Sequence, residues 1–131
     1  MKLITRDTDY AIRALRHIAC RQEDVVSVTQ LVKDLKVPRP FLRKALQLLE
    51  KRGLLRSYKG KGGGFALAIS PKKIFILDVA RVFQGPFKLN ECYLKKHVCP
   101  NTKICVLKKK IDAIERQIVQ ELKRVSIASL Y

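Results

Sequence analysis

Acidic side chains are scarce in this sequence: 11 Asp and Glu stand against 28 Lys and Arg, and the formal net charge is +17 at pH 7. A surface this basic attracts polyanions, and a dimer would carry twice the charge. The excess is concentrated, because the segment 35–77 contains eleven basic residues and a single acid, Glu50. The distribution predicts a basic patch, and double-stranded DNA is the expected partner.

Long apolar runs and histidines are also scarce. No run of about eighteen apolar residues is present, so neither a membrane span nor a membrane partner is expected. The start of the chain lacks the cationic and then apolar pattern of a signal peptide, which is typical of a cytoplasmic protein and argues against a disulfide framework. His17 and His97 are the only histidines. A catalytic cysteine needs a nearby base to activate it, and only these two histidines could serve. This argues against an enzyme and a small-molecule substrate.

The composition bounds the architecture. With 47% hydrophobic residues, the 131-residue chain can bury one core. The expected fold class is mainly α with a small β-hairpin wing (α+β). Residues 1–84 predict a winged helix-turn-helix domain, residues 85–105 a cysteine loop with a metal or cluster site, and residues 102–131 a long dimerisation helix and tail.

The first two helices are predicted from apolar spacing and capping signals. Apolar residues at helical spacing favour a helix over 9–21, in which Cys20 is expected to be a small buried residue and His17 structural or solvated. Ser27 and Gln30 form a capping box, with the glutamine side chain reaching back to the start of the second helix. Two prolines after residue 36 keep that helix short.

A longer third helix is expected between Pro40 and Gly53, a favourable start and a natural terminator. It follows the second helix after a four-residue turn, which is the helix-turn-helix pattern, so it is expected to enter the major groove. Its apolar stripe comprises Phe41, Leu42, Ala45, Leu46, Leu48 and Leu49. Its polar face, the expected DNA-binding face, comprises Arg39, Arg43, Lys44 and Gln47.

Two β-prone runs, 54–59 and 65–69, flank the glycine-rich segment 60–64. Glycines permit the tight hairpin turn and a close approach to phosphates, so the pair predicts a wing. A nucleotide-binding loop is disfavoured, because Gly-Lys-Ser/Thr opening a helix is missing. A short helix over 74–83 is expected to close the core. The expected DNA contacts from the wing are Arg56, Lys59 and Lys61.

Three of the four cysteines, Cys92, Cys99 and Cys105, fall within fourteen residues. The segment 91–104 contains a turn and no periodic apolar face, so it favours a loop in which sulfurs could turn to a shared metal. Thr102 or Asn101 is a plausible N-cap for the next helix, which would place Cys105 in its first turns, where the helix dipole favours a thiolate.

From residue 102 to 125 apolar residues step by three and four over about three heptads. A helix with such a stripe at the end of a small domain favours pairing with a second copy, and packing on its own domain is the alternative. The predicted dimer contacts are Ile104, Leu107, Ile111, Ile114, Ile118 and Leu122.

These motifs together resemble the Rrf family of bacterial winged-helix transcription regulators, which includes IscR and NsrR. The resemblance rests on four features of the sequence. They are Thr8-Asp9-Tyr10-Ala11, the pattern Phe41-Leu42, Leu46, Leu49 and Gly53-Leu54 of the third helix, the wing from Lys59 to Phe65, and three cysteines before a long helix. It implies a homodimer on a palindromic operator. It also implies an iron–sulfur cluster on the three cysteines, 2Fe-2S or 4Fe-4S, that reports iron, redox state, nitric oxide or cluster supply.

Some positions depart from the family pattern. Arg43 and Lys44 stand where relatives have a carboxylate or amide that contacts DNA, and Lys59 stands at the wing arginine. Cations at the first two positions favour phosphate or guanine contacts. Lys108 stands where some members have a histidine ligand.

The fourth ligand is open between His97, a small molecule and Asp9, which matches a carboxylate that NsrR-type relatives supply from the partner subunit. Asp9 could instead only favour the start of its helix. A structural zinc held by the three cysteines and His97 is the alternative to a cluster.

Overall fold

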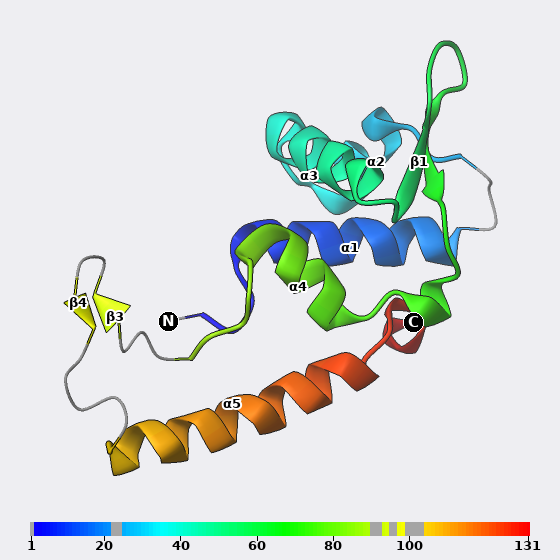
Figure 1. The fold of residues 1–131 in the computed structure, drawn as a ribbon. Helices are drawn as coiled ribbons and strands as arrows, with labels where there is room; N and C mark the ends of the chain where they lie inside the picture. The colour runs from blue at the N-terminus through cyan, green and yellow to red at the C-terminus, as the bar shows by residue number, and fades with distance from the viewer. Residues whose placement is uncertain (1, 22–24, 90–92, 95–96, 99–103) are drawn as a thin grey trace.

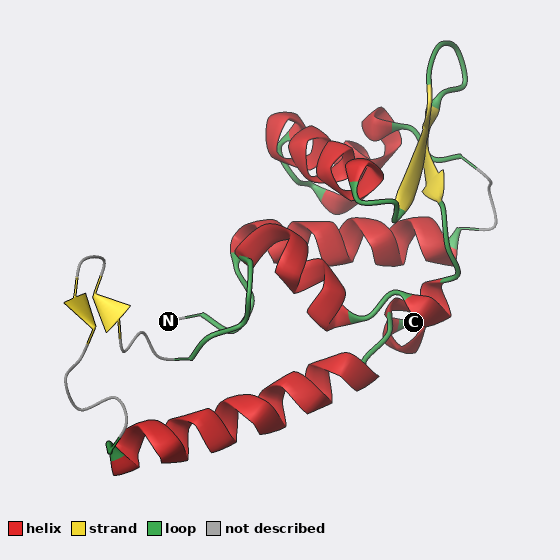
Figure 2. Ribbon diagram, viewed as in Figure 1, coloured by secondary structure: helices red, strands yellow, loops and turns green. Residues whose placement is uncertain are grey.

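The computed structural model describes residues 2–21, 25–89, 93–94, 97–98 and 104–131. Helices pack around α1, a two-stranded wing rises from one end, and α5 runs along the other side (Figures 1 and 2). No helix in these described ranges combines the length and apolar character needed to cross a membrane. The predicted fold class is confirmed. The elements in order are α1 (Arg6–Cys20), α2 (Val28–Leu35), α3 (Arg39–Lys51), β1 (Leu55–Tyr58), β2 (Gly64–Leu67), η1 (Pro71–Lys73), α4 (Ile76–Gln84), β3 (Tyr93–Leu94), β4 (His97–Val98), α5 (Val106–Arg124) and η2 (Ile127–Leu130).

Helix α1 lies at the centre of the core and begins earlier than predicted. The Thr5 side chain accepts a hydrogen bond from the Thr8 backbone N–H, so the cap precedes the expected start by several residues. The prediction that Cys20 is buried was wrong: it lies two residues beyond the buried Ile18, which turns it about 200° away from the apolar stripe, and it is exposed. The stripe that α1 buries consists of Ala11, Ala14, Leu15 and Ile18.

The second and third helices follow the predicted helix-turn-helix. Ser27 accepts the Gln30 N–H at 3.1 Å, which confirms the cap, but the Gln30 side chain does not reach back and instead donates to Asp34. Helix α3 buries one apolar stripe. Its first apolar residue, Phe41, was predicted to belong to that stripe, but the structure leaves it exposed. Phe41 is 45% exposed and carries the Arg6 guanidinium 5.1 Å from its ring centroid. The buried residues of α3 are Leu42, Ala45, Leu46 and Leu49.

The wing is an antiparallel pair in which Leu55 lies opposite Leu67 and Tyr58 opposite Gly64. It is attached to the helices through Val26, whose backbone exchanges hydrogen bonds of 2.8 and 2.9 Å with Phe65. Gly64 has φ +154°, and a Cβ there would lie 2.2 Å from the Val26 carbonyl oxygen. Only glycine therefore allows the wing to approach this close.

Helix α5 and the tail after it close the opposite side of the core. The tail carries the fully buried Ile127, and backbone hydrogen bonds join Val125 to Ile76 and Ile127 to Ile74. The helix begins at Val106, later than the predicted 102, because the Cys105 sulfur is itself the cap and accepts the Lys108 N–H at 3.4 Å.

The segment between α4 and α5 is also attached to α5. The Leu89 N–H donates to the Glu115 carboxylate at 2.9 Å. The prediction of a plain loop before α5 was wrong in part, because β3 and β4 form a short antiparallel pair with Tyr93 opposite Val98. Two residues in each strand suffice for that pairing, which is too short for a periodic pattern.

We expect Gly64→Ala to lower the free energy of unfolding by about 1–3 kcal/mol or more, because the added Cβ strains the backbone and meets the Val26 carbonyl. Gly62→Ala is the matched control: it also has a positive φ, +78°, but a Cβ there meets nothing within 4 Å. Urea unfolding of both variants measures the difference. Equal losses of stability would contradict a close contact between the wing and Val26.

Candidate nucleic-acid interface and metal centre

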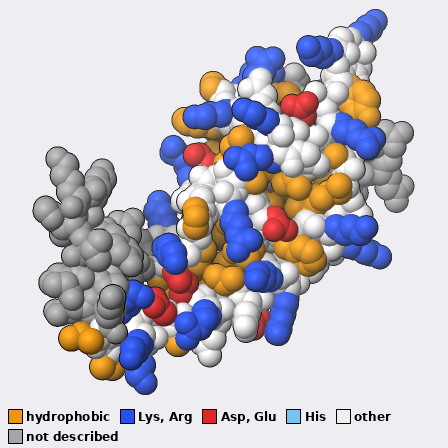
Figure 3. Space-filling view, in the orientation of Figure 1, with side chains coloured by type: hydrophobic (Ala, Val, Ile, Leu, Met, Phe, Trp, Pro, Cys, Tyr) orange, Lys and Arg blue, Asp and Glu red, His pale blue; other side chains and the backbone are white. Residues whose placement is uncertain are grey.

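A groove of about 680 Å³ lies between the helix-turn-helix and the wing. Its walls come from the start of α2, one face of α3, strand β1 and the glycine-rich tip of the wing. Lys and Arg side chains lie over α3 and at the tip of the wing, and others are spread over the rest of this face (Figure 3). The lining residues are Ser27, Val28, Thr29, Arg39, Arg43, Gln47, Glu50, Ser57, Tyr58, Lys59, Gly60, Gly63, Gly64 and Phe65.

Four of the seven predicted DNA-binding residues line this groove: Arg39, Arg43, Gln47 and Lys59. All four are exposed. The three on α3 recur every four residues, so they lie along one face of the helix. The Arg39 guanidinium donates to the Thr29 hydroxyl at 3.1 Å, which links the start of α3 to α2. The groove thus presents guanidinium, amide and ammonium donors from two elements that the fold holds together.

The other three predicted DNA-binding residues lie elsewhere. Arg56 and Lys61 are exposed on the wing without lining the groove. Lys44 was placed with Arg43 on one polar face, but the structure separates them: Lys44 borders a second hollow between the start of α1, α3 and the end of α4. One residue along a helix turns a side chain by about 100°, which is enough to move it off the groove.

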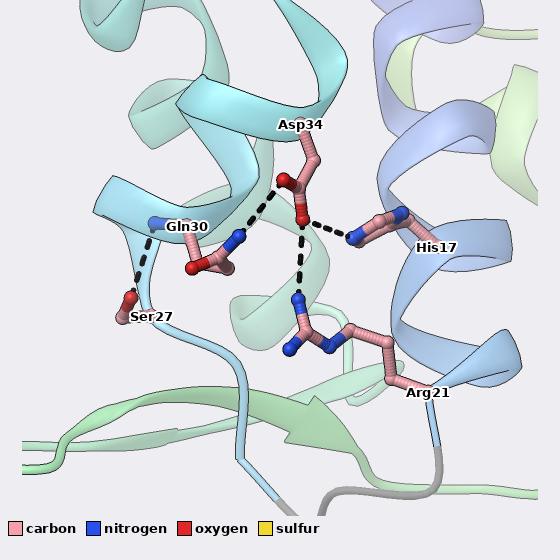
Figure 4. A network of polar contacts seen from close by, with 5 residues as sticks. All are labelled: His17, Arg21, Ser27, Gln30 and Asp34. Carbon is pink, nitrogen blue, oxygen red and sulfur yellow. Dashed lines mark hydrogen bonds and ion pairs between the residues drawn. The ribbon is translucent and has the colours of Figure 1, made fainter.

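The structure also shows a polar network that holds α2 against α1 (Figure 4). The Asp34 carboxylate accepts hydrogen bonds from the Gln30 amide at 2.8 Å and the Arg21 guanidinium at 3.1 Å, and His17 Nε2 lies 2.9 Å away. His17 is thus structural, as predicted. The Gln30 bond is the main cause that holds the pKa of Asp34 below its ordinary value; partial burial opposes it, and His17 and Arg21 add to the lowering.

Sequence reasoning did not single out Asp34 or Glu50 as site residues. Asp34 could have been found from its spacing, because Gln30 and Asp34 are four residues apart on one helix and can form a side-chain hydrogen bond. Glu50 stood out as the single acid of the basic segment. It lines the groove, and the Ser57 hydroxyl of β1 donates to its Oε1 at 3.3 Å.

Of the predicted metal ligands, the structure describes the side chains of Cys105 and Asp9. Cys105 is half-buried at the start of α5, where its sulfur accepts a backbone N–H. A cysteine sulfur is a donor that both a cluster and zinc accept, so this residue fits the predicted ligand set. Cys92 and Cys99 lie outside the described residues, and within the described part of the chain no three His, Cys, Asp or Glu side chains form a metal-binding group.

The candidates for the fourth ligand are placed differently. Asp9 lies in the first turn of α1, where its carboxylate pairs with Arg13 at 2.9 Å and its side chain is 43% exposed. This arrangement satisfies the simple helix-stabilising role and also leaves the carboxylate accessible from outside. The backbone of His97 lies in β4, two residues before Cys99 in the sequence.

The predicted dimerisation residues fall into two groups. Ile111, Ile118 and Leu122 are half-buried, and Leu122 packs against the core. The other three are exposed on the first half of the helix and just before it: Ile104 by 75%, Leu107 by 65% and Ile114 by 50%. Part of the stripe therefore serves the chain's own domain, and part is left uncovered.

Comparisons with known proteins support a regulator. A family model described as Rrf2, iron-dependent transcriptional regulator, matches residues 4–131. A putative HTH-type transcriptional regulator of Aquifex aeolicus is 37% identical over 123 residues, which cover 92% of this chain and 85% of that protein. The HTH-type transcriptional regulator NsrR of Bacillus subtilis is 31% identical over 110 residues, covering 82% and 75%.

A solved structure shows the same fold. The chain superposes on CymR, the global cysteine regulator of B. subtilis, with a TM-score of 0.75 over 99% of this chain and 96% of that one. The sequences are 22% identical, so this similarity concerns the arrangement of helices and wing.

Proposed function

The chain belongs to the Rrf2 family of transcriptional regulators, and we propose that it binds a palindromic DNA operator as a homodimer whose affinity an iron–sulfur cluster controls. The observation that carries the DNA-binding part is the groove between α3 and the wing, lined by Arg39, Arg43, Gln47 and Lys59. A recognition helix beside a basic wing is the arrangement that reads a duplex in this architecture.

The side chains divide by the contacts they can make. Arg43 and Gln47 lie along the groove face of α3 and carry the geometry for base edges, guanine for the arginine and adenine for the glutamine. Lys59, Lys61 and Arg56 on the wing supply phosphate contacts, which are independent of sequence. Lys44 adds to phosphate attraction from outside the groove.

The dimer rests on the uncovered apolar residues in the first half of α5 and just before it. Ile104, Leu107 and Ile114 expose half or more of their surface, and a second copy of the same helix would cover them. Such a contact is symmetric, because each residue meets its counterpart region in the other chain. It would place two recognition helices on two half-sites, which a palindromic operator requires.

Cys92, Cys99 and Cys105 would hold the cluster, with Asp9 of the partner subunit as the proposed fourth ligand. The support is the donor chemistry: three thiolates in one segment are the ligands that iron–sulfur clusters prefer. Tyr93, which follows Cys92 in the sequence, lies opposite Val98, which precedes Cys99. A bound cluster would supply a centre that reacts with oxygen or nitric oxide and so reports iron, redox state or nitric oxide.

The second candidate keeps the DNA binding and replaces the cluster by a structural zinc, or by no metal. His97 with the three cysteines gives the tetrahedral donor set that zinc accepts. Protein purified without oxygen absorbs visible light if it holds an iron–sulfur centre, whereas zinc is colourless. Iron and sulfide analysis of the same sample tests the proposal directly, and zinc alone in stoichiometric amount would contradict it.

We expect Arg43→Ala to weaken DNA binding and relax base preference, because it removes donors from the groove. Lys59→Ala should weaken binding to all duplexes alike and reduce the steepness of log affinity against log salt by about 0.9. Fluorescence anisotropy over a salt series measures both. Lys44→Ala is the control, since it removes a charge from the same helix outside the groove and should leave base preference unchanged. An Arg43→Ala variant with unchanged affinity and preference would show that α3 is not the recognition helix.

We expect Ile114→Asp to abolish the dimer, because the charge would be buried against the second copy without a partner. The folded monomer tolerates the change, since Ile114 is 50% exposed. Sedimentation velocity should show monomers that no longer hold the operator. Gln120→Asp, an exposed position on α5 outside the stripe, should remain dimeric. A fully dimeric Ile114→Asp would place the interface elsewhere.

We expect Asp9→Ala to keep a cluster, shift its absorption spectrum and speed its reaction with nitric oxide or oxygen, while Cys99→Ala loses the cluster outright. Asp7→Ala is the control: Asp7 lies in the same first turn of α1 and shares the helix-dipole effect without being a proposed ligand. Anaerobic absorption and stopped-flow kinetics compare the three. Identical behaviour of the Asp7 and Asp9 variants would exclude the carboxylate ligand and favour His97.

A further inference from the structure

The groove proposed to hold DNA contains one negatively charged residue among those that line it, Glu50. It lies on the same face of α3 as Arg39, Arg43 and Gln47, toward the C-terminal end of the helix. It is also the single acid of the segment 35–77, against eleven basic residues. A carboxylate here opposes the attraction of phosphate that its neighbours provide, so its presence calls for a separate role.

Helix stability does not account for Glu50. The residue is the second last of α3, where the negative end of the helix dipole disfavours an anion. Within the described part of the chain it forms no ion pair with a lysine or arginine. Its side chain is exposed, so burial does not explain it either.

The wing holds the carboxylate in place. The Ser57 hydroxyl donates to Glu50 Oε1 at 3.3 Å, and Ser57 lies opposite Phe65 in the wing, whose backbone pairs with Val26. A carboxylate offers about four acceptor positions, so one bond from Ser57 leaves capacity for another donor. Glu50 is therefore an oriented acceptor inside a groove whose other charged groups are donors.

We infer that Glu50 is a specificity-determining residue, which accepts a hydrogen bond from a base amino group and repels the phosphates of non-cognate DNA. The cytosine N4 amino group is the donor that a carboxylate reads in the major groove. The inference rests on the proposed DNA binding. It predicts effects of opposite sign: without the carboxylate, non-cognate duplexes bind more tightly, and discrimination at one base pair of each half-site is lost.

The experiment starts from a pool of randomised duplexes, from which the parent protein selects its preferred sequence. Anisotropy then gives the affinity of the parent, Glu50→Ala and Glu50→Gln for that duplex, for each single base-pair change and for a scrambled duplex. Glu121→Gln is the charge-matched control, because Glu121 is 74% exposed on α5, away from the groove. Ser57→Ala keeps the charge and removes the bond that orients it.

We expect both Glu50 variants to bind the scrambled duplex more tightly, because both remove the charge. Glu50→Ala should also lose about five- to 100-fold discrimination at one C·G pair per half-site, whereas Glu50→Gln keeps an amide oxygen that accepts a hydrogen bond and should lose less. Glu121→Gln should leave that discrimination unchanged, and Ser57→Ala should reduce it without the gain on scrambled DNA. Uniformly weaker binding to every duplex would overturn the inference, because it is the result of a purely structural link to the wing. If both Glu50 variants discriminate between the duplexes as the parent does, the inference is overturned while the proposed function stands. A parent protein that binds no duplex overturns both.

Discussion

Two backbone hydrogen bonds between Val26 and Phe65 hold the wing against the helix-turn-helix, and the candidate interface depends on them. A two-stranded hairpin is marginally stable alone in water. Here Val26 extends it, and both residues are buried, so the bonds are shielded from competing water. The groove exists because this contact sets the wing beside α3, and the absence of a side chain at Gly64 permits it.

The same domain must also tolerate a net charge of +17. It does so by leaving most cations exposed, where water screens them, and by using a few carboxylates at joints between elements. Asp34 joins α1 to α2, and Glu115 joins the segment after α4 to α5. Each of these carboxylates thus stabilises a junction, while the cations of α3 and the wing stay exposed.

The helices and the wing were predictable because their signals are local. Ser27, the prolines around Arg39 and the glycines of the wing mark boundaries within a few residues of where they act, and the structure confirms them. The errors have local causes too: the Cys105 sulfur caps α5 in place of Thr102 or Asn101, and Thr5 caps α1 before the apolar stripe begins.

The site was predictable only as a set of residue types. Whether a residue of α3 faces the groove depends on where β1 packs, which the periodicity of α3 does not contain. Lys44 therefore lies exposed beside another hollow, and its contact with DNA remains a prediction. The bond between Glu50 and Ser57 likewise joins two elements. The Cys92 and Cys99 predictions lie outside the described residues, and the division into three segments and the dimer remain predictions.

The chain on both sides of the cysteine segment is attached to one helix, α5. Leu89 is bound to Glu115 in the middle of α5, and Cys105 caps the start of the same helix. Ten residues of helix separate Cys105 from Glu115, which is about 15 Å. Much of the entropy cost of closing that loop is already met when the domain folds, so the thiolates proposed to lie within it would meet a metal at a raised effective concentration. Through the same two attachments, a metal bound by this segment would act directly on α5.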